Sequence, residues 1–132
     1  MSAKEMPEEV IEKRNVSFVV RYDRAEALAR LGGDEELLAD VATLFIAESE
    51  DYCRALELAL AVADAAAVQR EAHTVKSMLA TFSCESGRQR AFELEQLGAS
   101  GQLAGAAALV AEVSLMIRAL AQVLEKDARG AV

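Results

Sequence analysis

The C-terminal part of the chain carries an apolar repeat that restricts the fold more than any other feature of the sequence. Its members follow one another in alternating steps of three and four residues: Leu103, Ala106, Val110, Val113, Ile117, Leu120 and Leu124. This spacing aligns the side chains in one seam along an α-helix, and such a regular seam has to be buried against other helices. The sequence therefore predicts a last helix that packs lengthwise against further helices.

The composition favours helices in the rest of the chain as well. Hydrophobic residues make up 53% of the 132 residues but aromatic residues only 5%, with no tryptophan and one proline. Alanine, leucine, glutamate and arginine favour helices, while the β-branched and aromatic residues that favour strands are scarce. A chain of this length is most simply one domain with a sizeable core. The expected fold class is all-α.

Helix start and stop signals divide the chain. The predicted N-caps are Asp23, Asp34, Asp64 and Ser86. The helices that they open are expected to end at Gly32–Gly33, at about Ala61, at about Ser83 and at Gly98. Because the connections are short, neighbouring helices are expected to be antiparallel. The prediction is an antiparallel up-down-up-down four-helix bundle with a short preceding cap helix over residues 22–126, an N-terminal tail and extended lead-in at 1–21, and a C-terminal tail at 127–132.

One segment, 15–20, has the composition of a β-strand. A lone strand has no partner in an all-α chain, so we expect an extended lead-in that packs on the bundle. A dimer contact is the alternative role for its apolar residues, although we expect the protein to be a monomer.

The charge balance argues against several partners. The formal net charge is −8 and the isoelectric point is near 4.7, so the phosphates of a nucleic acid would be repelled. The sequence offers no basic amphipathic helix for a membrane surface, we expect no apolar run of transmembrane length, and the charged N-terminus is unlike a signal peptide. The two cysteines, Cys53 and Cys84, are too few for a disulfide framework. We therefore expect a cytoplasmic protein.

Motifs of ordinary enzymes and metal sites are missing. The sequence has no glycine-rich nucleotide loop and no HExxH motif, and one histidine with two distant cysteines does not supply the ligands of a zinc site. Cys84 lies too far along from His73 for a thiol–imidazole nucleophile pair. A solvated face explains Glu48, Glu50 and Asp51 better than acid–base catalysis does. The histidine remains as the residue whose chemistry needs an explanation.

The single histidine, His73, points away from the buried side of its helix. The apolar stripe of that helix consists of Val68, Ala72, Val75, Leu79 and Phe82. At about 100° per residue, His73 lies about 140° from the centre of the stripe and Lys76 about 80°. An imidazole with the ordinary pKa of about 6.5 is mostly neutral in the cytosol, so a ring nitrogen can accept a phosphoryl group, which a lysine one turn along can stabilise. A surface histidine beside a surface lysine without any role fits the same geometry.

The residues around His73 resemble a known family. Ala72-His73-Thr74-Val75-Lys76-Ser77, followed by Phe82-Ser83, is similar to the core motif of the histidine-containing phosphotransfer (HPt) domain. The similarity continues in Tyr22-Asp23, in 31–38, at Phe45 and in Ala91 with Leu94-Glu95, and so covers residues 22–125. Ser77 and Ser83 replace two glycines of the family. We expect the Ser77 hydroxyl to be able to donate to a phosphoryl group, and Ser83 to lie near a neighbouring helix where a small residue suffices.

The resemblance implies a phosphoryl carrier without kinase activity of its own, in which His73 is phosphorylated and Lys76 steadies the phosphoryl group. Its partners would be response-regulator receiver domains and a hybrid sensor histidine kinase. The receiver aspartate would be donor and acceptor, and the receiver would also supply the Mg²⁺, so no cofactor or metal site of the chain's own is expected. The expected docking residues are Gln69, Arg70, Ser77 and Ala80 around His73, with Phe45 and Ser49 on the preceding helix.

Two other functions are compatible with the sequence. The bundle could be a docking or scaffolding module that is never phosphorylated, which the two glycine replacements and the long apolar seam favour. It could also be the phosphoacceptor domain of a chemotaxis-type histidine kinase, in which case an ATP-binding kinase domain would be the phosphoryl donor.

Overall fold

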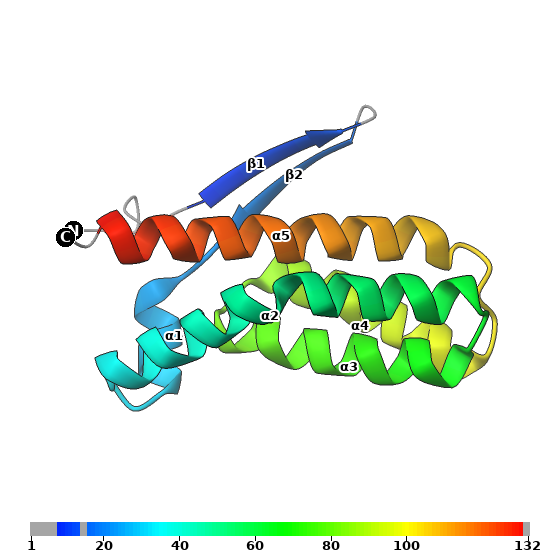
Figure 1. The fold of residues 1–132 in the computed structure, drawn as a ribbon, viewed down its shortest axis with the longest axis horizontal. Helices are drawn as coiled ribbons and strands as arrows, with labels where there is room; N and C mark the ends of the chain where they lie inside the picture. Colours follow the sequence, from blue (N-terminus) through cyan, green and yellow to red (C-terminus); the bar gives the residue numbers. More distant parts are fainter. Residues whose placement is uncertain (1–7, 14–15, 131–132) are drawn as a thin grey trace.

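The computed structural model describes residues 8–13 and 16–130. In chain order its elements are β1 (Glu8–Lys13), β2 (Val16–Arg21), α1 (Arg24–Arg30), α2 (Glu35–Ala61), α3 (Ala65–Thr81), α4 (Glu85–Ser100) and α5 (Ala106–Gly130). The four long helices α2 to α5 lie side by side as a bundle, and the short α1 sits at one end of it (Figure 1). The most extensive packing is that of α3 on α4 and of α2 on α5. The predicted all-α bundle with a short preceding helix is confirmed.

Aspartate side chains begin three of the helices, as the sequence predicts. Asp23, Asp34 and Asp64 each accept a hydrogen bond of 3.0 Å from the backbone N–H three residues further on, at the starts of α1, α2 and α3. Each bond satisfies one of the amide groups that have no partner within the first helical turn. The Asp64 cap determines where α3 begins, and therefore how far along this helix His73 lies.

The predicted bounds of α4 are wrong at both ends. The helix begins at Glu85, and its N-cap is Cys84 instead of the predicted Ser86. The Cys84 side chain makes no capping hydrogen bond, because it is buried in the core. At the other end the helix continues past the predicted stop to Ser100, and it ends where Gly101 adopts a left-handed φ of 77°.

The predicted stop, Gly98, serves close packing between two helices. A Cβ atom at this position would lie only 2.5 Å from the backbone nitrogen of Gln69 and 2.9 Å from the carbonyl oxygen of Ala65, both on α3. No side chain fits there, so glycine is the residue that allows α3 and α4 to approach so closely. This contact fixes the position of α4 relative to the helix that carries His73.

The predicted stripe of α3 and seam of α5 form the centre of the core. All five stripe residues of α3 are at most 1% exposed, and the seam of α5 is buried from Ala106 to Leu124. The rings of Phe45 and Tyr22 pack against Phe82 with centroid distances of 5.4 Å and 6.0 Å, which ties α2, α3 and the start of α1 together. Because this side of α3 is buried, its opposite side faces the solvent.

The expected extended lead-in is in fact one strand of a β-hairpin. β2 matches the β-like segment of the sequence, but it pairs antiparallel with β1 along the whole of both strands. Both strands contact α5 (Figure 1). On α5, Met116, Ala119 and Val123 are buried although they lie outside the predicted seam. A two-stranded hairpin is only marginally stable without such a surface to pack on. The sequence pattern did not reveal β1, because four of its six residues are charged.

Among the described residues, α5 is the one helix that is long and apolar enough to cross a membrane, judged by length and composition. The expectation that no apolar run reaches such a length is therefore wrong. Within the protein, 56% of the most apolar window of α5 is buried. The helix packs on the bundle with one side and under the hairpin with another, and this explains why apolar residues cover so much of its circumference.

Candidate functional site

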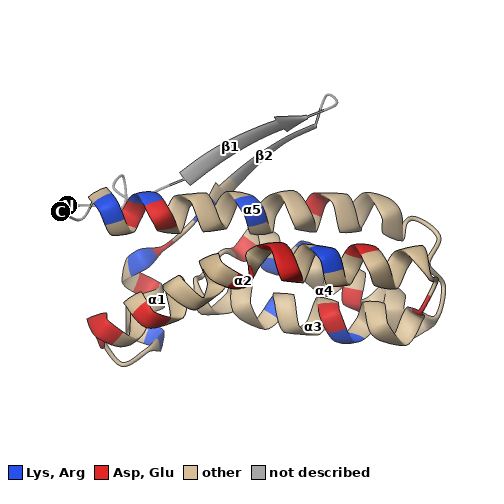
Figure 2. Ribbon diagram, viewed as in Figure 1, with Lys and Arg blue, Asp and Glu red and all other residues tan. Residues whose placement is uncertain are grey.

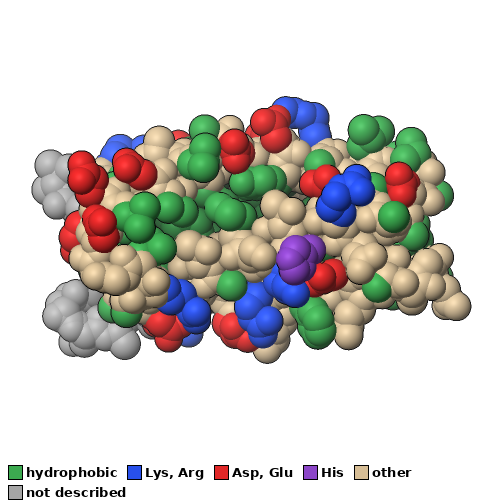
Figure 3. All heavy atoms as spheres, turned by 90° about the horizontal axis from the view of Figure 1, so that it is seen from below, with side chains coloured by type: hydrophobic (Ala, Val, Ile, Leu, Met, Phe, Trp, Pro, Cys, Tyr) green, Lys and Arg blue, Asp and Glu red, His purple; other side chains and the backbone are tan. Residues whose placement is uncertain are grey.

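His73 lies on the solvent side of α3, as predicted. Its side chain is 60% exposed, while Ala72 and Val75, which belong to the apolar stripe of the same helix, are buried. Figure 3 shows the histidine at the surface with acidic and basic side chains next to it. An imidazole in this position is open to a large partner molecule.

A carboxylate on α4 orients the imidazole. The Nδ1 atom of His73 lies 2.8 Å from Oε2 of Glu95. Because an ionised carboxylate can only accept a hydrogen bond, Nδ1 carries the hydrogen in this pair. The other ring nitrogen, Nε2, is then the one that keeps its lone pair. The arrangement therefore selects Nε2 as the nucleophilic atom of an exposed ring.

The same carboxylate also holds the lysine. Nζ of Lys76 lies 2.7 Å from Oε1 of Glu95 and 5.2 Å from the centroid of the Phe92 ring. Glu95 is only 17% exposed, and this burial by itself raises the pKa of its carboxyl group. Lys76 and His73 outweigh the burial, and the resulting pKa is lowered. Glu95 is therefore ionised at neutral pH and can bind both side chains at once.

The packing of α4 explains why Glu95 reaches His73. Phe92, Glu95 and Gly98 follow one another at intervals of three residues and share the face of α4 that lies against α3. Gly98 brings the two backbones together one turn after Glu95. The distance from carboxylate to imidazole is thus set by a contact between backbones rather than by flexible side chains.

The two serines that replace family glycines both form hydrogen bonds within the protein. The Ser77 hydroxyl donates a hydrogen bond of 3.1 Å to the carbonyl oxygen of His73, so it is engaged within its own helix. Ser83 has a left-handed φ of 54°, just after the end of α3. Glycine suits this position because of its backbone freedom and not because of its small size. Nε of Arg30 donates to the Ser83 hydroxyl at 3.0 Å.

The predicted docking residues divide into two groups. Gln69, Arg70 and Ser77 are exposed on α3 beside His73, and Ala80 is half-buried. On α2 the prediction needs correction, because Phe45 is fully buried and Ser49 is 7% exposed. Both lie on the side of α2 that faces the core.

The surface of α2 is formed by the residues immediately before those two. Leu44 is 52% exposed, and Glu48 is half-buried with its carboxylate accepting a hydrogen bond from the Tyr52 hydroxyl. A shift of one residue turns a helix by about 100°, which is enough to move a side chain from the core to the solvent. Leu44 and Glu48 therefore replace Phe45 and Ser49 on the surface of α2.

Other reactive groups lie apart from His73. Cys53 and Cys84 are buried, and burial raises the pKa of both thiols. In the part of the chain that the structure describes, no three histidine, cysteine, aspartate or glutamate side chains gather as a candidate metal site. The ionisable cluster that contains an exposed nucleophile is thus the group of His73, Lys76 and Glu95.

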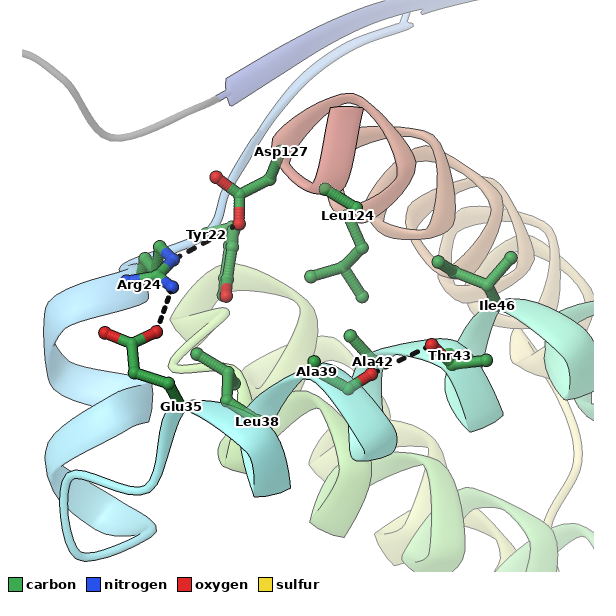
Figure 4. A pocket seen from close by; sticks show the side chains of 11 residues that line it. Tyr22, Arg24, Glu35, Leu38, Ala39, Ala42, Thr43, Ile46, Leu124 and Asp127 are labelled. Carbon is green, nitrogen blue, oxygen red and sulfur yellow. Dashed lines mark hydrogen bonds and ion pairs between the residues drawn. The ribbon is translucent and has the colours of Figure 1, made fainter. Parts of the chain in front are cut away.

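A cavity of about 280 Å³ lies between the start of α2 and the end of α5 (Figure 4). Apolar side chains such as Leu38 and Leu124 form its walls, and Arg24 pairs with Glu35 and Asp127 at its edge. No residue of α3 or α4 lines this cavity. It is therefore separate from the histidine cluster.

A family model identifies the family of this fold: the model of the Hpt domain matches residues 40–123, more than half of the chain. The chain belongs to the Hpt domain family. The match includes His73, Lys76 and Glu95, and it begins within α2, so the hairpin and α1 precede it. Hpt domains act in histidine phosphotransfer in two-component signalling. They are phosphocarriers and not kinases, and their partners are response-regulator receivers and kinases.

A solved structure has the same fold. Histidine-containing phosphotransfer protein B (HptB) from Pseudomonas aeruginosa PAO1 is similar to this chain with a TM-score of 0.75 and 21% sequence identity. The similarity covers 83% of this chain and 95% of the HptB chain. No curated protein matches the sequence. The Hpt bundle accounts for most of the chain.

Proposed function

We propose that this Hpt domain is a phosphorelay carrier that accepts a phosphoryl group on Nε2 of His73 from a receiver-domain aspartate and passes it to the aspartate of another receiver. One observation carries this proposal. The bond from Nδ1 of His73 to Glu95 places the ring hydrogen on one nitrogen and leaves a lone pair on the other, in a side chain that is 60% exposed.

The transfer step follows from this tautomer. The Nε2 lone pair attacks the phosphorus of the receiver's aspartyl phosphate, the Nε2–P bond forms, and the bond from phosphorus to the aspartate oxygen breaks. The aspartate leaves as a carboxylate. Because Nδ1 keeps its proton, the ring gains a positive charge, which the Glu95 carboxylate at 2.8 Å stabilises. Transfer to the next receiver is the reverse of this step.

Lys76 supplies positive charge near the phosphoryl oxygens. It lies one helical turn from His73, and Glu95 and Phe92 hold its ammonium group in place. An ammonium group acts on a phosphoryl group as a point charge. In the proposal the receiver brings the Mg²⁺ that assists the transfer, and this chain contributes no cofactor.

The docking face is proposed to include Gln69, Arg70, Ser77 and Ala80 around His73, with Leu44 and Glu48 on α2. These α2 residues take the place of Phe45 and Ser49, which the core buries. The partners are response-regulator receiver domains and a hybrid sensor histidine kinase, and the carrier works as a cytoplasmic monomer without kinase activity. A relay requires a contact that forms and dissociates quickly, so the interface should be of modest area.

Phosphoryl labelling tests the proposal. Purified protein is mixed with candidate receiver domains, acetyl phosphate and Mg²⁺, and the bound phosphoryl group is measured with time. The wild type should be labelled and His73→Gln should not. Labelling of the His73→Gln variant, or no labelling of the wild type by any receiver of the source organism, would contradict it. Partner binding without labelling, unchanged in His73→Gln, would instead favour a docking module.

A further inference from the structure

Phe92 is an exposed aromatic residue beside the reactive histidine. Other aromatic side chains with a described environment are more buried: Tyr22, Phe45 and Phe82 lie in the core, and Tyr52 is half-buried. Phe92 is 41% exposed, although it is large and apolar. Aromatic residues, phenylalanine included, are enriched in protein–protein interfaces.

The position of Phe92 connects it to the site. Its ring centroid lies 5.2 Å from Nζ of Lys76, and Lys76 shares the Glu95 carboxylate with His73. Phe92 is also one helical turn before Glu95 on the same face of α4. The ring therefore forms the α4 border of the surface that surrounds His73.

We propose that Phe92 is an anchor for the receiver domain, so that the docking face extends from α3 onto α4. This inference rests on the proposed phosphotransfer function. A receiver has to bring its aspartate to Nε2 of His73, and an interface of the modest size typical of transient contacts covers about 600 Å² of each partner, a disc of about 14 Å radius. A disc of that size centred on His73 includes a ring that lies 5.2 Å from Lys76.

Docking also strengthens the contact between Phe92 and Lys76. The attraction of an ammonium group to an aromatic face increases when water is removed from the pair. A receiver that covers Phe92 would therefore hold Lys76 more firmly near the phosphoryl group. For this reason the receiver is expected to present an apolar side chain, next to its phosphorylated aspartate, to the Phe92 ring.

A second copy of this chain is a less suitable partner for the same surface. Each copy carries a formal net charge of −8, and acidic residues occur on every helix (Figure 2). Two such molecules repel each other at long range. The charge thus disfavours self-association at Phe92.

The test uses three variants and a receiver domain that labels the wild type, phosphorylated with acetyl phosphate and Mg²⁺. Phe92→Ala removes the ring, and Phe92→Leu keeps an apolar side chain without an aromatic face. Leu37→Ala is the matched control, because Leu37 is also 41% exposed but lies in the first turn of α2, near α1. Initial rates at increasing receiver concentration give KM and kcat for labelling, and circular dichroism checks that each variant is folded.

The proposal predicts that Phe92→Ala raises KM roughly five- to ten-fold, as expected for an interface anchor. Phe92→Leu should stay within about two-fold of the wild-type KM, because most of the apolar area is kept. Leu37→Ala should leave KM unchanged. An unchanged KM for Phe92→Ala, with or without a lower kcat, would overturn the anchor role, and so would an equal rise for Leu37→Ala. Wild-type labelling is measured separately, so a failure of the proposed function is recognised by itself.

Discussion

Replacing Gly98 by alanine tests the claim that a backbone contact positions the site. The added Cβ would lie 2.5 Å from the Gln69 nitrogen, 2.8 Å from its Cα and 2.9 Å from the Ala65 carbonyl oxygen. All three are backbone atoms, so no side chain can move aside. Ordinary contact begins at 3.4 Å, and α4 therefore has to move away from α3 by about 0.9 Å.

The size of the effect follows from two opposing contributions. Overpacking a well-filled interface costs about 3 kcal/mol at the upper end of the usual range, whereas alanine favours a helix over glycine by about 1 kcal/mol. The free energy of unfolding should thus fall by about 2 kcal/mol, which lowers the urea midpoint by about 1 M. The same movement lengthens the 2.8 Å contact between His73 and Glu95 beyond the reach of a hydrogen bond.

Two measurements check this prediction. Urea unfolding followed by circular dichroism gives the midpoint, and ¹⁵N NMR of the imidazole shows whether Nδ1 remains the protonated nitrogen. Gly87→Ala is the control within the same helix: its Cβ would meet the Leu79 Cδ1 at 3.1 Å and the Cys84 Sγ at 3.3 Å, side-chain atoms that can shift slightly. A Gly98→Ala protein with wild-type stability and an unchanged His73 tautomer would show that the backbone contact at Gly98 does not position Glu95.

Three further predictions concern helix ends and Glu95. Ala63→Gly should raise the free energy of unfolding, measured in urea, by about 0.5–1 kcal/mol, because Ala63 has a φ of 55° that glycine adopts without strain. Ser83→Gly should raise the free energy of unfolding by less, because it also removes the hydrogen bond from Arg30. An equal rise for the two variants would show that this hydrogen bond does not stabilise the protein. Glu95→Gln should slow labelling of His73 about ten-fold in the receiver assay, because a neutral amide stabilises the positive ring less than a carboxylate does; a wild-type rate would show that Glu95 does not assist transfer. The pKa of Glu95 is lowered in the folded protein, so its contribution to stability is present above the ordinary glutamate pKa and is lost as the pH falls through the lowered one. Thermal unfolding between pH 6 and pH 3 should therefore show a smaller loss of stability for Glu95→Gln than for the wild type, and parallel curves would contradict this.

Local sequence patterns predicted most of the helical fold. Stripes with helical spacing and the aspartate caps depend on residues close together in the chain, and they gave the course of α2 and the beginning of α3. Features that depend on distant partners were missed. Gly98 looked like a helix stop, but its role comes from the backbone of α3, and β1 is recognisable as a strand only through its pairing with β2 and its packing on α5.

The candidate site was predictable to the same extent. His73 and Lys76 share one helix, so their spacing alone placed them together on its outer side. Glu95 entered the prediction only through a family resemblance, because no pattern within α4 shows which of its residues faces His73. Phe45 was expected at the surface, although it belongs to the apolar positions of its own helix. In the structure its side chain is buried in the core.

Locating the phosphoryl group on the imidazole tests the proposed function most directly. Protein labelled with ¹⁵N-histidine is phosphorylated by a receiver domain with acetyl phosphate and Mg²⁺, and the coupling between ³¹P and ¹⁵N identifies the bonded nitrogen of its single histidine, His73. We expect phosphorus on Nε2 and a proton on Nδ1. Phosphorus on Nδ1, the atom that Glu95 holds, would contradict this expectation.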